Sequence, residues 1–329
     1  MLANDDPLFE PTIPAEELHR ALQNENVEQL RPLLPVGYAA GVDAYRQAAA
    51  ALDAHALSTH YTEGLSWFHG DFVPALRRRI EGLVGGAWDL SNHVAFAAGS
   101  DVDLIAHVVN AATLRGDVNV YPGDWWGFAS GSLSPERVRF STSSGAQLAA
   151  ICVPSVRNGH TTGAMLDFLA SARTRILNIN LLPTLSPKER NSVATSLAPL
   201  LSRSLLSISF SRGFGLTASQ LGVLLAPKAP GLTGSELIDE LGLARPLEWT
   251  TYFYNRIAAM AFLAIDLDRL AATDTARRAF ASQWLRDRGL PVVESGSYYV
   301  KAFRFTGALP ERLLPLERNG LVRICLKPS

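Results

Sequence analysis

The sequence predicts a three-layer α/β/α domain with a mostly parallel sheet, followed by a small α+β domain. Between residues 94 and 225, short apolar runs that are typical of buried strands alternate with helical stretches. A long helical stretch covers about 249–288, and strand, helix and strand patterns follow it. We therefore divide the chain into an N-terminal arm with a short helix, a large domain, and a linking helix with a small domain, at residues 1–42, 43–250 and 251–329.

The bulk composition indicates a cytoplasmic protein. The 329 residues are 47% hydrophobic, and a net charge of −1 gives no electrostatic attraction to nucleic acid or to an anionic membrane. The N-terminus lacks the basic and apolar regions of a signal peptide, and no apolar run is long enough to span a membrane. Cys152 and Cys325 stand in apolar runs, so we expect two buried free thiols. No spacing of His, Cys and acidic residues indicates a metal site.

The N-terminal quarter is predicted to contain an arm, helices and an aromatic loop. Residues 1–15 are rich in prolines and acids and are expected to be extended, and a short helix starts at Pro14. Residues 43–57 are Ala-rich and helical, and residues 61–70, with two adjacent aromatics, are expected to form a loop. A helix is predicted over 71–84 because its apolar residues recur on one face.

Beyond residue 90, apolar runs predict the strands and helices, and Gly, Pro and Asn residues between them predict the turns. Strands are predicted over 94–98, 117–121, 148–153, 175–182, 205–210, 221–225, 298–305 and 321–326. Helices are predicted from 101 to about 115 and over 187–201, 235–243, 249–288 and 309–318.

One strand-to-helix turn has the composition of an anion site. Gly99, Ser100 and Asp101 follow a strand and open a helix, where backbone N–H groups converge with a hydroxyl. Such residues also cap many helices that bind no ligand. The turn is therefore a candidate site that needs a second indication.

That indication is the segment Ser209-Phe210-Ser211-Arg212-Gly213-Phe214-Gly215-Leu216 and the residues that follow it. It resembles the lysine segment of class I/II aminotransferases, which belong to fold type I of the pyridoxal 5'-phosphate (PLP) enzymes. The family pattern is roughly Ser-x-Ser-Lys-x-Phe-Gly-Leu, with an arginine eight residues after the lysine. Arg212 stands at the lysine position, and Gln220 stands at the arginine position.

The resemblance extends from about residue 55 to the C-terminus and implies roles for other residues. It implies that the Gly99–Asp101 turn binds the phosphate of the cofactor. Trp125 or Trp126 would stack on the pyridine ring, and the amide of Asn158 would contact the phenolic oxygen. Asn178 or Asn180 stands where the family has an aspartate that pairs with the ring nitrogen. Ser209 and Ser211 complete the cofactor set, and the implied substrate residues are Tyr61 and Arg323, whose guanidinium would bind an α-carboxylate. A homodimer is also implied.

The substitution at Arg212 changes the chemistry that the resemblance implies. A guanidinium stays protonated and can neither form an internal aldimine nor shuttle a proton. We therefore expect no covalently bound cofactor, while PLP or pyridoxamine phosphate (PMP) held without a covalent bond stays open. His160, His69 or His60 could supply the proton transfer instead.

Three interpretations follow. The first is an enzyme that acts on an amino-acid-like or carboxylate substrate without an internal aldimine. The second is a non-catalytic structural or regulatory partner. The third is an ordinary PLP aminotransferase in which arginine has replaced the lysine.

Overall fold

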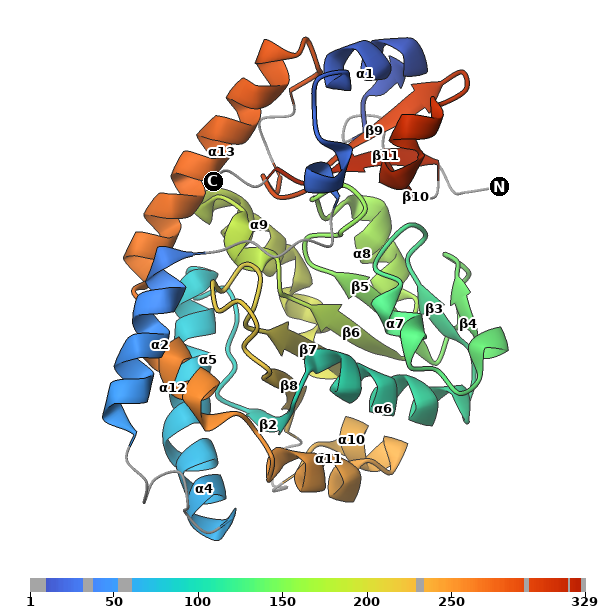
Figure 1. Cartoon of the computed structure of the whole chain (residues 1–329). Coiled ribbons are helices and arrows are strands. Elements are labelled where there is room, and N and C mark those ends of the chain that lie inside the picture. Colours follow the sequence, from blue (N-terminus) through green and yellow to red (C-terminus); the bar gives the residue numbers. More distant parts are fainter. Residues whose placement is uncertain are drawn as a thin grey trace.

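In the part of the chain that the computed structural model describes, seven strands form a central sheet (Figure 1). The model describes residues 10–31, 38–52, 61–228, 234–292, 296–318 and 320–326. The strand order is β2-β8-β7-β6-β5-β3-β4, and only β8 runs antiparallel to its neighbours. The strands are β2 (His93–Ala98), β3 (Val118–Val120), β4 (Val138–Phe140), β5 (Leu148–Cys152), β6 (Thr174–Asn178), β7 (Ser204–Ser209) and β8 (Gly222–Pro227). The predicted mostly parallel sheet is confirmed, although the short edge strand β4 was not predicted.

Helices cover both faces of this sheet, because its central strands are apolar on both sides. Leu205 and Leu224 pack in one core, whereas the adjacent Leu206 and Leu225 pack in the other. The first core is covered by α6 (Asp101–Thr113), α7 (Gly127–Ser130), α10 (Glu236–Leu241) and α11 (Ala244–Thr251). The second is covered by α5 (Val73–Leu83), α8 (Gly163–Ala170), α9 (Pro187–Leu197) and α12 (Arg256–Ala264), with α2 (Ala39–Ala51) beside α12 (Figure 1). The predicted three-layer arrangement is confirmed.

Residues 61–70 are helical, so the predicted loop is wrong. They form α4 (Tyr61–Trp67) and then a single π-helical turn, Phe68–Phe72, that continues into α5. Phe68 and Phe72 are four residues apart and fully buried, and Trp67 stacks on Tyr254 with ring centroids 6.2 Å apart. The aromatic side chains that suggested a loop therefore form the buried face of a helix.

The N-terminal and C-terminal segments together build a second, four-stranded sheet. Its order is β1-β9-β11-β10, from β1 (Thr12–Pro14), β9 (Lys301–Thr306), β10 (Glu317–Arg318) and β11 (Leu321–Ile324). β1 pairs in parallel with β9, so the described part of the predicted arm is a strand of this sheet. Helix α1 (Ala15–Leu22) and a 3-10 helix, Val27–Leu30, follow β1. The predicted helix over 309–318 is instead a 3-10 helix, Glu311–Leu316, that contains Pro315.

The single long helix predicted over 249–288 is wrong. The chain forms α11, α12 and α13 (Leu267–Asp287), and the last of these runs along the side of the molecule (Figure 1). Asn255 accepts a hydrogen bond from the N–H of Ala258, and Asp266 accepts from Asp268 and Arg269. Both side chains start a new helix, because an N-cap residue leaves helical geometry. The apolar periodicity continues through these breaks and therefore concealed them.

A buried carboxyl group joins three distant segments behind the central sheet. Asp274 on α13 accepts hydrogen bonds from Tyr38 at 3.0 Å and Tyr298 at 2.9 Å, and the two tyrosine oxygens are 2.8 Å apart. Burial raises the pKa of Asp274 from its ordinary value of 3.8 to about 6, although the two tyrosines and then Arg277 and Arg278 lower it. The folded protein therefore holds this proton more tightly than the unfolded chain does.

The stability of the protein is expected to depend on Asp274 between pH 4 and pH 7. Because the folded pKa is raised, the stabilisation is complete below about pH 4 and is lost as pH rises through 6. At about 1.4 kcal/mol per pH unit, the loss is roughly 3 kcal/mol. Asp274→Asn keeps the shape and cannot titrate. Urea unfolding should therefore give a wild-type free energy that falls, relative to this variant, by roughly 3 kcal/mol over that range. Parallel curves for the two proteins would contradict the assignment.

Candidate functional site

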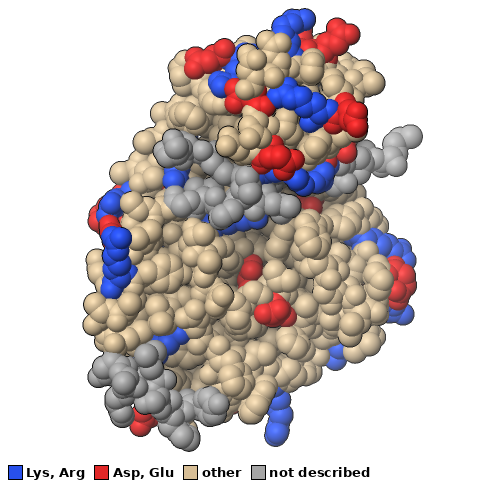
Figure 2. Space-filling view, in the orientation of Figure 1, with Lys and Arg blue, Asp and Glu red and all other residues tan. Residues whose placement is uncertain are grey.

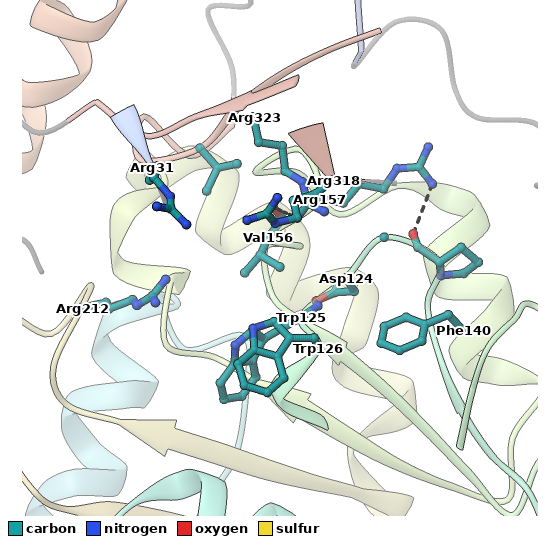
Figure 3. Close-up of a pocket in the computed structure, with 13 residues that line it drawn as sticks. Arg31, Asp124, Trp125, Trp126, Phe140, Val156, Arg157, Arg212, Arg318 and Arg323 are labelled. Atoms are coloured by element: carbon teal, nitrogen blue, oxygen red, sulfur yellow. Dashed lines mark hydrogen bonds between the residues drawn. The ribbon is translucent and has the colours of Figure 1, made fainter. Parts of the chain in front are cut away.

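A cavity of about 630 Å³ lies between the central sheet and the small sheet (Figure 3). Its floor comes from the segments that follow β3, β5 and β7, at the carboxyl ends of parallel strands, where ligands of open α/β sheets bind. Its roof comes from the small sheet and the N-terminal segment. The lining residues are Arg31, Pro122, Gly123, Asp124, Trp125, Trp126, Phe140, Val156, Arg157, Arg212, Val300, Arg318 and Arg323.

Five arginines and a single acid line the cavity, so its field is positive. Four of the arginines donate hydrogen bonds to acidic side chains or backbone carbonyls, and the fifth, Arg212, lies over an aromatic ring. Arg31 pairs with Glu28 at 2.8 Å, and Arg318 donates to the carbonyl of Glu317 at 2.6 Å. Arg157 donates to the buried Glu10 at 2.7 and 3.0 Å and to the carbonyl of Pro122 at 3.3 Å (Figure 3).

Charge of both signs is spread over the outer surface around the small sheet, while the face over the central sheet is mostly uncharged (Figure 2).

Arg323 is the buried arginine of the cavity wall. It lies on β11, its exposed fraction is 7%, and its Nη1 donates to the carbonyl of Val156 at 3.2 Å. Its Nε is buried and has no hydrogen-bond partner in the described structure. Burial lowers its pKa, and the charges of Asp124 and Cys325 oppose that effect. A buried N–H donor without a partner is costly, and a ligand oxygen in the cavity would satisfy it.

Asp124 is a lining residue that the sequence reasoning did not identify. Its Oδ1 accepts hydrogen bonds from the N–H of Trp125 at 2.6 Å and of Cys152 at 3.3 Å, and its Oδ2 accepts from Ser155 at 2.6 Å. Burial raises its pKa, and these donors lower it. The sequence feature that could have identified Asp124 is its position in the turn after a strand, directly before the two tryptophans.

Both tryptophans line the cavity, and the structure does not choose between them (Figure 3). Trp125 lies flat over Gly127, where a Cβ would come within 2.3 Å of the indole, and it meets Phe128 edge-on with ring centroids 5.4 Å apart. Trp126 is 62% exposed. Two indoles at the floor offer flat apolar surface to a planar ligand group.

Arg212 is positioned by a tightly packed loop after β7. The hydroxyls of Ser209 and Ser211 are 2.9 Å apart, and the N–H of Gly213 donates to the carbonyl of Asn180 at 3.0 Å. A Cβ on Gly213 would lie 2.6 Å from that carbonyl oxygen. The guanidinium of Arg212 lies over the ring of Tyr299, 5.8 Å from its centroid. Arg212 and Arg323 therefore line one cavity.

The turn at Gly99, Ser100 and Asp101 does not line this cavity. The hydroxyl of Ser100 caps α6 by accepting from the N–H of Asp103 at 3.2 Å, and Gly99 borders a separate depression. The buried carboxylate of Asp101 accepts hydrogen bonds from Asn178 at 3.0 Å and Asn180 at 2.9 Å. Gln220, at the position of the family arginine, is exposed.

Asn158 and His160 do not line the cavity. The N–H of His160 donates to the Oδ1 of Asn158 at 2.9 Å, and both residues border a small void beside Lys301 and Phe303. Burial lowers the pKa of His69, which does not line the cavity. His60 lies outside the described residues, and so does the side chain of Tyr61.

Within the described residues, both cysteines are free and buried, as predicted. No cluster of three or more His, Cys, Asp or Glu there could hold a metal ion. No helix in the described ranges is long and apolar enough to cross a membrane.

Solved structures of aminotransferases are similar to the whole chain. Aspartate aminotransferase from Thermotoga maritima superposes with a TM-score of 0.63 at 16% identity, over 96% of this chain and 91% of that one. YbdL from Escherichia coli, described as having a methionine aminotransferase function, gives 0.60 at 15% identity, over 99% and 95%. Histidinol-phosphate aminotransferase from Sinorhizobium meliloti, solved in complex with PLP, gives 0.54 at 16% identity, over 100% and 94%.

No protein-family model and no curated protein sequence matches the chain. The likeness therefore rests on three-dimensional structure. The chain has the aminotransferase fold of the fold type I PLP enzymes.

Proposed function

We propose that the protein binds a small, amino-acid-like organic carboxylate in the arginine-lined cavity and acts on it without an internal aldimine. The observation that carries this proposal is Arg323, a buried guanidinium whose Nε has no hydrogen-bond partner among the described residues. A carboxylate accepts from a guanidinium through two parallel hydrogen bonds, which a neutral group cannot match.

The rest of the wall suits the same ligand. Arg212 supplies a second permanent cation, and the indoles of Trp125 and Trp126 cover the apolar part of the ligand. Among the described lining residues there is no lysine, so no lining amine is available for a Schiff base.

The residues present do not fit a PLP held as the resemblance would require. A phosphate needs free N–H donors and positive charge, yet a buried carboxylate of Asp101 stands at the turn and Gln220 is exposed. An amide of Asn178 replaces the acid that would hold a ring proton. The interpretation as an ordinary PLP enzyme with one replaced lysine predicts an otherwise intact site, and these residues argue against it.

Proton transfer in the cavity would fall to Asp124, the one carboxyl group among the described lining residues, whose pKa is raised by burial. His160, the candidate from the sequence, borders a different void. We therefore assign Asp124 as the general acid or base of the enzyme interpretation.

The second candidate function is a non-catalytic protein that binds the ligand as a structural or regulatory partner. One observation favours it. Hydrogen bonds from Trp125, Cys152 and Ser155 hold the buried carboxylate of Asp124 in place, so a structural role accounts for this residue without any reaction.

Calorimetric titration of the purified protein tests the binding proposal. The ligands are a series of amino acids and 2-oxo acids, each compared with its uncharged amide. The carboxylate is expected to bind at least 10-fold more tightly than its amide, and the preference should shrink as salt is raised. Equal affinity for acid and amide across the series would overturn the proposal. If the bound acid is then converted to a product, the protein is an enzyme; if it stays unchanged, the non-catalytic alternative holds.

We also propose that the protein is a cytoplasmic homodimer, as its resemblance implies. Two aromatics at the cavity, Trp126 and Phe140, are 62% and 42% exposed, and a second copy over the rim would cover them. Light scattering that gives the mass of a single chain at all concentrations would exclude this assembly.

A further inference from the structure

We propose that a second cavity, which we call the α13 cavity, binds a small organic anion with an apolar body, of the class of an aliphatic monocarboxylate. The site goes beyond the proposed function, because it shares no lining residue with the arginine-lined cavity. Its central feature is Arg190, a buried arginine of its wall that has no anionic partner among the described residues.

The α13 cavity has a volume of about 380 Å³, which suits a small molecule. Its wall comes from α5, α9, α12 and the first half of α13, together with the segments that follow β6 and β7 (Figure 1). Apolar side chains make up much of this wall, and they include Leu83, Phe214, Phe262, Leu267, Leu270 and Ala271. Such a wall can cover an aliphatic chain and exclude water from it.

Arg190 lies on α9, and its exposed fraction is only 9%. Its Nη1 donates to the carbonyl of Pro183 at 3.0 Å, whereas its Nε is buried without a hydrogen-bond partner. Within the described residues it makes no other hydrogen bond and no ion pair, so its Nη2 also lacks an acceptor. A buried guanidinium in this state is costly, and a carboxylate in the cavity would supply both the acceptors and the missing charge.

The charged groups around Arg190 do not supply that partner. Burial lowers the pKa of Arg190, and the charge of Arg278 lowers it further, whereas Asp274 opposes both effects. Asp274 accepts hydrogen bonds from two tyrosines and acts on Arg190 only through its charge. Arg79, a half-buried residue of the wall, donates to two backbone carbonyls and therefore adds a further positive charge.

The remaining two charged residues of the wall, Arg78 and Asp268, are exposed and of opposite sign, so water and salt screen them. The inner wall thus has two cations, Arg79 and Arg190, against one acid, Asp274. A carboxylate beside Arg190 would balance these charges, while the apolar part of the ligand lies along the leucine and phenylalanine side chains.

Calorimetric titration of the whole protein with octanoate tests the site. Acetate, which lacks the chain, and octan-1-ol, which lacks the charge, are the matched probes. Octanoate is expected to bind the wild type at least 10-fold more tightly than either probe, because it alone satisfies both the guanidinium and the apolar wall. Arg190→Gln should weaken octanoate binding at least 10-fold. Ala271→Trp keeps every charge and should weaken it by a similar factor, because the indole fills the cavity.

Arg323→Gln is the control for the arginine-lined cavity, and the Arg190-dependent binding of octanoate should persist in it. Loss of octanoate binding in Arg323→Gln but not in Arg190→Gln would overturn the inference. So would a wild type that does not bind octanoate, or that binds it no more tightly than octan-1-ol or acetate. If Arg190→Gln does not fold, Ala271→Trp decides, and unchanged binding in that variant would also overturn the inference.

Discussion

Replacing Arg323 by glutamine is expected to weaken carboxylate binding by about 100-fold. The variant keeps a polar side chain of similar length but loses the charge and the paired donors. Charged hydrogen bonds contribute roughly 1.5–3 kcal/mol each, and about 1.4 kcal/mol corresponds to a factor of 10 in affinity. Isothermal titration with the best carboxylate found for the wild type measures the change.

Arg318 provides the matched control, because it lines the same cavity from the neighbouring strand β10 and is exposed. Arg318→Gln removes the same charge at a site that water screens, so we expect a loss of less than about 5-fold. Arg323→Lys keeps the charge without the planar fork and should recover only part of the affinity. An Arg323→Gln protein that binds like the wild type, beside a weakened Arg318→Gln, would move the carboxylate site to the outer wall.

Arg212 and Arg323, which line the same cavity, were singled out from the sequence because their signals are local. Arg212 stands in a loop where Ser and Gly residues are closely spaced. Arg323 stands in a C-terminal strand, three residues after Gly320. The remaining arginines of the cavity were not found. Arg31, Arg157 and Arg318 come from segments that meet only in three dimensions, and no spacing in the chain connects them.

Glu10→Gln is expected to lower the free energy of unfolding by about 3–5 kcal/mol. Glu10 is 2% exposed and accepts hydrogen bonds from Arg157 at 2.7 and 3.0 Å and from Arg304 at 3.0 Å. Removing its charge leaves the guanidinium of Arg157 buried without its counter-ion, which costs far more than an exposed pair contributes. Urea-induced unfolding followed by fluorescence and by circular dichroism measures the difference.

Glu28→Gln is the control for Glu10→Gln. It breaks an ion pair with Arg31 at 2.8 Å, but Glu28 is 66% exposed, so the expected loss is below about 1 kcal/mol. Equal stabilities for the two variants would mean that the Glu10 pair is solvated in solution. A large loss for Glu10→Gln would establish that the N-terminal segment is an integral part of the roof of the cavity.

Most of the fold followed from apolar periodicity, and the errors have identifiable physical causes. Periodicity reports burial and says little about where one buried helix ends, so the caps at Asn255 and Asp266 were overlooked inside a continuous apolar pattern. The aromatic segment before α5 was predicted as a loop from its composition, although the four-residue spacing of its buried aromatic side chains is that of a helix. The sequence did not predict that Asp124 is buried, or that Glu10 pairs with Arg157, because both depend on contacts between segments that are distant in the chain.

The place of β1 beside β9 also bears on how the protein folds during synthesis. β1 is made first, yet its partner β9 lies about 290 residues later, from Thr12↔Arg304 to Pro14↔Thr306. The small sheet is therefore completed only when β9, β10 and β11 have left the ribosome. Contacts so distant in sequence form slowly, because a long loop must close before they contribute. The central sheet can assemble on the emerging chain, whereas the roof of the arginine-lined cavity is added only after β9 and β11 have emerged.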